Sequence, residues 1–159
     1  MQLTLFDDQL PPSPPVQPQY SLQLTAHIPR VREATGEPIR DAKGFVEVAQ
    51  GLQELAVECF LAASLSQKNA LIDLHLISMG SLTGALVHPR EVFRPILLDA
   101  GAAVTFLHNH PSGDPAPSRD DREITARLVE AARIIGIRVL DHVVIGHNRY
   151  FSFAEEGLL

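Results

Sequence analysis

Residues 108–121, from His108 to Asp121, have the sequence HNHPSGDPAPSRDD, and this stretch decides the fold. It follows an apolar run at 103–107 that is typical of a buried strand. It leads into a pattern that predicts a long helix from Ser118 to Ile135, closed by Gly136. The segment therefore joins a strand of the core to a helix through a short loop.

Three side chains of this segment form a candidate metal site. Because side chains alternate along a strand, His108 and His110 project from the same face, where two imidazoles can converge on one ion. Ser118 is a candidate N-cap, so Asp121 lies in the first helical turn and the loop folds its carboxylate back as a third ligand. Three protein ligands leave the fourth position of one tetrahedral Zn²⁺ ion to water, which is typical of a catalytic site.

Attack on an amide bond also needs a proton acceptor that later protonates the leaving amine. Glu58 is the candidate, because it precedes the apolar residues 59–63, where an unpaired charge is costly. The alternative for Glu58 is a solvated carboxylate at the end of a strand. The alternative for Ser118 is that it serves as a helix cap and has no other role. His142, which follows an aspartate in a later strand, is interpreted as structural.

The remaining pattern predicts a mixed α/β fold in which helices cover a central sheet. Asp41 is a candidate helix cap, and apolar residues at helical spacing after it predict a helix that reaches Leu55. Further predicted elements are an edge strand at 22–26, a hairpin of strands at 58–65 and 72–76, a helix at 89–101 in which Pro95 is a candidate kink, and strands at 139–145 and 150–153.

Composition indicates one domain with a tail. The chain has 159 residues, 45% of them hydrophobic and 20% charged, which is enough for one core. Five prolines between positions 11 and 18 predict an extended linker, so residues 1–20 are interpreted as an N-terminal peptide with a flexible spacer and residues 21–159 as the domain.

Charge and cysteine content restrict the environment and partners. A formal net charge of -6 disfavours direct binding to DNA. The single cysteine, Cys59, allows no internal disulfide, and the start of the chain lacks the basic and apolar regions of a signal peptide. No apolar run approaches the about 18 residues that span a bilayer. A cytoplasmic protein without a membrane segment is expected.

The pattern H-x-H-x7-S-x2-D with an upstream glutamate resembles the JAMM signature of the JAB/MPN metalloprotease-like domains. The full segment 108–121, together with PREVF at 89–93 and DHVVIG at 141–146, resembles the RadC-like JAB domain of bacteria. The resemblance covers about residues 40 to 159. It implies a three-layer α/β fold, one Zn²⁺ ion on the three ligands named above, a water activated by Glu58, and an oxyanion stabilised by Ser118.

Active JAB/MPN members cleave peptide or isopeptide bonds, so the resemblance implies a zinc metallohydrolase that acts on peptides or isopeptide-linked proteins. The RadC branch takes its name from DNA repair. On this resemblance, the proline-rich tail is expected to stand in place of the helix-hairpin-helix-like region of longer RadC proteins, which weakens the case for DNA binding. Two histidines and a carboxylate also suit a non-haem iron enzyme. Nucleobase deamination is disfavoured, because its P-C-x-x-C ligand pair needs two cysteines.

The N-terminal peptide suggests a non-enzymatic alternative. Gln2, Leu3, Leu5 and Phe6 belong to the sequence QLTLF, which is similar to peptides that dock on the bacterial replicative sliding clamp. In that case the chain is an adaptor for replication or repair, and the metal only holds the loop after His108. The alternative for this peptide is a strand that packs on a neighbouring protomer.

Overall fold

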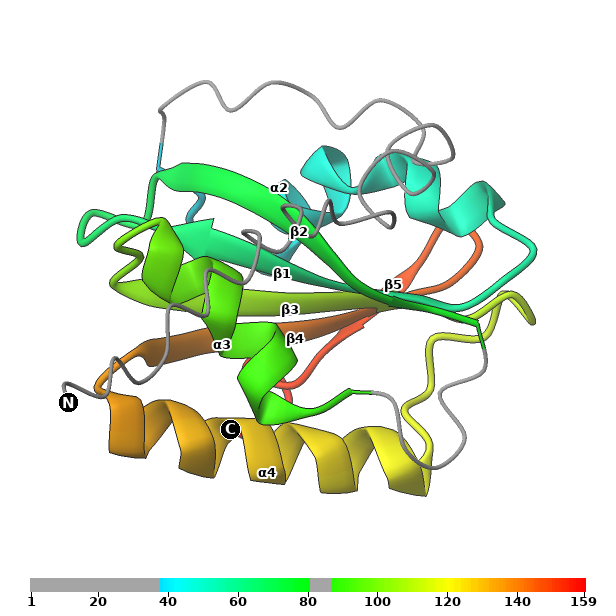
Figure 1. Ribbon diagram of the computed structural model, residues 1–159. Coiled ribbons are helices and arrows are strands. Elements are labelled where there is room, and N and C mark those ends of the chain that lie inside the picture. The colour runs from blue at the N-terminus through cyan, green and yellow to red at the C-terminus, as the bar shows by residue number, and fades with distance from the viewer. Residues whose placement is uncertain (1–37, 81–86) are drawn as a thin grey trace, which may run out of the picture.

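The computed structural model describes residues 38–80 and 87–159, which form a sheet flanked by helices (Figure 1). In chain order the elements are α2 Ala42–Val48, the 3-10 helix η1 Gln50–Glu54, β1 Cys59–Leu65, β2 Leu71–Met79, α3 Pro89–Leu98, β3 Ala103–Asn109, α4 Arg119–Ile135, β4 Arg138–Ile145 and β5 Tyr150–Ser152. The predicted strand at 22–26, the N-terminal peptide and the linker lie outside the described residues.

The sheet is mixed, with the strand order β2-β1-β3-β4-β5. β1 pairs antiparallel with both β2 and β3, whereas β3 and β4 are parallel and are joined by α4. A parallel pair requires a crossover, so the chain must turn back over the sheet directly after β3. This turn brings the first residues of α4 to the carboxyl end of β3, where the HNH sequence lies.

Two apolar cores lie on opposite faces of the sheet, so the predicted three-layer α/β architecture is confirmed (Figure 1). Phe45 and Leu52, from α2 and η1, pack on one face. Phe93 of α3 and Leu128 of α4 pack on the other. β1 and β3 are buried along their whole length because they have a core on each side.

Most predicted elements are present, but the first helix differs from expectation. Asp41 caps α2 by accepting a hydrogen bond from the backbone N–H of Gly44 at 2.9 Å, as predicted. The helix does not continue to Leu55: α2 ends at Val48 and the separate turn η1 follows. The tighter turn still buries Leu52.

The other boundaries differ by a few residues. α3 runs continuously through Pro95 and ends at Leu98 rather than at residue 101, and β2 is longer than the predicted strand. α4 starts after Ser118 and ends at Gly136, whose φ of 84° closes the helix, as predicted. Within residues 38–80 and 87–159, no helix is long and apolar enough to cross a membrane.

Candidate metal centre

The structure brings the three predicted ligands together at the carboxyl end of β3. The Nε2 atoms of His108 and His110 are 3.0 Å apart. The carboxylate of Asp121 completes the group, with Oδ1 3.2 Å from Nε2 of His108 and Oδ2 3.3 Å from Nε2 of His110. Donors about 2.0 Å from a tetrahedral Zn²⁺ ion lie about 3.3 Å from one another. The separations and chemistry of these donors therefore fit a zinc ion.

A buried chain of hydrogen bonds fixes which nitrogen of His108 faces the candidate metal position. Thr125 donates its hydroxyl proton to the backbone carbonyl of Asp121 at 2.5 Å. The Thr125 oxygen therefore accepts from Nδ1–H of His142 at 2.6 Å. Nε2 of this ring in turn accepts from Nδ1–H of His108 at 2.8 Å. Nε2 of His108 therefore faces the candidate metal position, where it would offer its lone pair to an ion in place of its hydrogen bond to Asp121.

His142 suits this role because its ring is neutral. Complete burial, with a contribution from the neighbouring His108, lowers the pKa of His142 well below its ordinary value. A neutral imidazole has one donor and one acceptor, and both are used here. Partners of this kind hold metal-binding histidines in one orientation and one tautomer. The residue that the sequence analysis interprets as structural therefore supports a metal ligand.

A hydrogen bond to the following loop fixes the orientation of the His110 ring. Its Nδ1–H donates to the backbone carbonyl of Asp114 at 2.7 Å, which leaves Nε2 toward Asp121. The hydrogen bond to Asp121 is the main cause of the raised pKa of His110, and the charge of Glu58 adds to it. Burial alone raises the pKa of Asp121, but the hydrogen bonds to the two histidines outweigh it and hold this pKa well below the ordinary value. Asp121 is thus ionised and ready to bind a cation.

Ser118 and Asp121 form a capping box at the start of α4, so the predicted cap is confirmed. The Ser118 hydroxyl accepts from the backbone N–H of Asp121 at 3.1 Å and donates to Oδ2 of the same residue at 2.6 Å. The backbone N–H of Ser118 donates to the same oxygen at 2.7 Å. Ser118 therefore orients the carboxylate of a ligand while it caps the helix.

Glu58 lies beside this group, directly before β1. Together with His110, Ser118 and Asp121 it lines one cleft of about 610 Å³. The contribution of its charge to the pKa of His110 also indicates proximity. The structure thus assembles the predicted proton acceptor, two of the ligands and the predicted oxyanion donor around one accessible space, while His108 is fully buried behind them.

Asn109, between the two histidines, has a role that the sequence analysis does not anticipate. Its side chain points to the opposite face of β3 from His108 and bonds to the backbone on both sides of Glu58. Oδ1 accepts from the N–H of Cys59 at 2.8 Å, and Nδ2 donates to the carbonyl of Val57 at 3.0 Å. A buried polar side chain between two ligands is the only sign of this role in the sequence.

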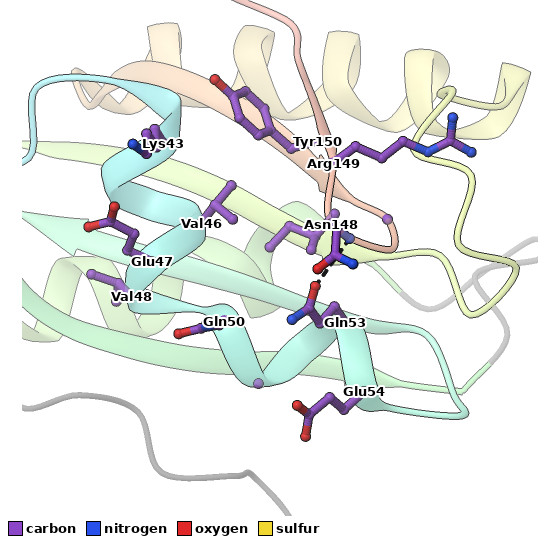
Figure 2. A pocket seen from close by; sticks show the side chains of 13 residues that line it. Lys43, Val46, Glu47, Val48, Gln50, Gln53, Glu54, Asn148, Arg149 and Tyr150 are labelled. Atoms are coloured by element: carbon purple, nitrogen blue, oxygen red, sulfur yellow. Dashed lines mark hydrogen bonds between the residues drawn. The ribbon is translucent and has the colours of Figure 1, made fainter.

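Two other features do not include the three candidate ligands. A cavity of about 840 Å³ is lined on one side by α2 and η1 and on the other by the turn before β5 (Figure 2). The backbone N–H of Asn148, in this turn, donates to the side-chain carbonyl of Gln53 in η1 at 3.3 Å. Neither a histidine nor an aspartate is among the described residues that line it. A second group of side chains contains Asp73, His75 and Asp99. Its histidine is accounted for by a 2.6 Å ion pair with Asp99, and Asp73 is exposed.

Two histidines from a strand end and an aspartate from the next helix, set in a three-layer α/β fold, define the class of JAB-type domains. A family model described as "RadC-like JAB domain" matches residues 39–158, and the chain belongs to this family. The resemblance noted in the sequence is thereby confirmed.

Relatives of the chain share this region. UPF0758 protein STH371 of Symbiobacterium thermophilum is 53% identical over 115 residues, which are 72% of this chain and 49% of the relative. A UPF0758 protein of Trichlorobacter lovleyi is 56% identical over 108 residues, 68% of this chain and 47% of the relative. The chain thus spans about half the length of these relatives. Their names state no activity.

Proposed function

We propose that this domain is a zinc-dependent hydrolase of amide bonds in peptides or isopeptide-linked proteins. One observation carries the proposal: ligand atoms of His108, His110 and Asp121 all lie within 4.8 Å of one another, and Glu58 lines the same cleft as the last two residues. Three protein ligands leave a coordination position open, which distinguishes a catalytic zinc site from a structural one. A carboxylate beside such a position is suited to proton transfer.

Each residue has a defined part in this reaction. His108, His110 and Asp121 would hold the zinc ion, which would supply a Lewis acid that lowers the pKa of water and polarises a carbonyl. Glu58 accepts a proton from the water that attacks the carbonyl carbon. It then delivers this proton to the nitrogen of the leaving amine as the carbon–nitrogen bond breaks. The carboxylate returns to its initial state, so the proton balance closes within one turnover.

Ser118 has a single hydroxyl proton, which it gives to Oδ2 of Asp121 in this structure. Stabilisation of a substrate oxyanion therefore requires this proton to turn toward the cleft. The backbone N–H of Ser118 continues to hold the same carboxylate oxygen during that change. We therefore assign Ser118 both the orientation of Asp121 and, during catalysis, a hydrogen bond to the oxyanion.

The proposal is tested by metal analysis and by hydrolysis of a quenched-fluorescence peptide library. We expect about one zinc ion per chain, and we expect Glu58→Gln to keep the ion while activity falls at least about 100-fold. Glu54→Gln is the matched control, because this exposed glutamate lies four residues away in η1. Retained activity in Glu58→Gln, or tightly bound iron in place of zinc, would contradict the proposed mechanism.

A further inference from the structure

We propose that Asn109 is a positioning residue that fixes Glu58 relative to the metal ligands. This inference rests on the proposed function, in which Glu58 transfers the proton. The last backbone pair between β1 and β3 joins Phe60 to His108. One position further on, the side chain of Asn109 bonds to the N–H of Cys59. A side-chain amide thus continues the pairing where the backbone ladder ends.

The contacts of Asn109 lie on both sides of Glu58. The N–H of Cys59, directly after Glu58, donates to Oδ1 at 2.8 Å. The carbonyl of Val57, directly before Glu58, accepts from Nδ2 at 3.0 Å, and the carbonyl of Leu55 accepts from the same nitrogen at 3.5 Å. The amide of Asn109 thus uses its acceptor and its donor group on one segment.

Glu58 depends on this support because it precedes β1 and is outside the strand. Its own carbonyl accepts from the N–H of Gly80 at 2.8 Å, which leaves the flanking groups to Asn109. Asn109 is 1% exposed, so water does not compete for these bonds. It also follows His108 directly and precedes His110. Asn109 therefore fixes the position of the segment that carries Glu58 relative to the two histidine ligands.

Position matters for the proposed role because a proton acceptor must come within about 3 Å of its proton. A misplacement of 1 Å can reduce a rate about 100-fold. A purely structural asparagine would stabilise the protein without affecting where Glu58 lies. The two roles therefore differ in what happens to Glu58 when the amide is removed and the metal ligands are kept.

The first test measures the position of Glu58 without an activity assay. The full-length protein is loaded with Co²⁺, and NMR pseudocontact shifts of backbone amides report their positions relative to the metal. We expect Asn109→Ala to bind one equivalent of Co²⁺ and to keep the shifts of Thr105 and Phe106 in β3. We expect the shifts of Glu58 and Cys59 to change. Ser152→Ala, which removes a different buried hydrogen bond, is the matched control and should leave Glu58 in place.

Asn109→Asp is a second variant of nearly the same shape. It keeps an acceptor for the N–H of Cys59 but replaces the donor to the carbonyl of Val57 with an acceptor, so that two oxygens oppose each other. We expect the same displacement of Glu58 in this variant. It therefore provides the test if the alanine variant does not fold.

The second test is a double-mutant cycle with peptide hydrolysis as the readout. We expect Asn109→Ala to lower kcat about 10- to 100-fold with a smaller change in KM. The same substitution should have no further effect in a Glu58→Gln background, because the residue acts through Glu58.

Unchanged Glu58 shifts in both Asn109 variants, or equal losses of kcat in the two backgrounds, would refute the inference. An inactive wild type whose Glu58 shifts respond as expected would refute the proposed function and leave the positioning by Asn109 intact.

Discussion

Replacement of His142 tests whether the buried hydrogen-bond chain prepares the metal ligand. In His142→Leu the ring nitrogen that accepts from Nδ1–H of His108 at 2.8 Å is lost, and nothing else in the chain of bonds replaces it. Both residues are fully buried, so the unpaired donor of His108 costs about 1–3 kcal/mol of unfolding free energy. Loss of such a partner lowers metal affinity about 10- to 100-fold. That range corresponds to about 1.4–2.8 kcal/mol of binding free energy.

The assay is competition with a chelator for Zn²⁺, combined with urea unfolding of the metal-free protein. His142→Gln is the conservative variant, because its side-chain carbonyl restores an acceptor toward His108, and it should recover most of the affinity. His75→Gln removes a histidine from a remote ion pair and should bind zinc as the wild type does. If His142→Leu binds zinc with unchanged affinity, the tautomer of His108 does not depend on His142 and the reasoning fails.

Three further predictions concern the same centre and the tail. In the metal-free protein, the raised pKa of His110 contributes stability that is full below about pH 6.5 and is lost as the pH rises through the raised pKa. The lowered pKa of Asp121 contributes stability above about pH 3.8 that is lost as the pH falls, and the lowered pKa of His142 contributes stability that is lost as the pH falls below about 6.5. Calorimetry should therefore find maximal stability near pH 6.5. Ser118→Ala should lower the unfolding free energy by about 1 kcal/mol through loss of the cap and should also weaken zinc binding, as urea unfolding with and without zinc would show. Deletion of residues 1–10 should abolish affinity for a bacterial sliding clamp in a surface-binding measurement and leave the zinc content unchanged; a clamp affinity equal to that of the full chain would eliminate the docking proposal.

The ligand set could be predicted because it depends on local rules. The two-residue period of a strand places His108 and His110 on one face, whatever the rest of the chain does. The spacing of Ser118 and Asp121 is that of a capping box, which fixes the aspartate in the first turn. The loop between His110 and Ser118 is short, so it returns the carboxylate of Asp121 to the end of the strand.

The supporting residues could not be predicted, because they depend on register between distant segments. Asn109 meets Cys59 across a sequence separation of 50 residues, and only the antiparallel register of β1 and β3 brings them together. His142 meets His108 because β3 and β4 are parallel with Phe106 opposite His142. Periodicity assigns each side chain to a face but does not determine which strands are neighbours. The break between α2 and η1 could not be predicted, because the apolar spacing suits either helix type.

The alternation within HNH explains how one short sequence serves both parts of the centre. His108 faces α4, which carries Asp121 in its first turn and Thr125 one turn later, and His142 lies on the adjacent strand. Asn109 faces the opposite layer, where the segment before β1 carries Glu58. Insertion or deletion of one residue in β3 would exchange these faces and separate the ligands from their partners. The metal centre and the position of Glu58 therefore depend on the same strand register, although they are supported from opposite sides of the sheet.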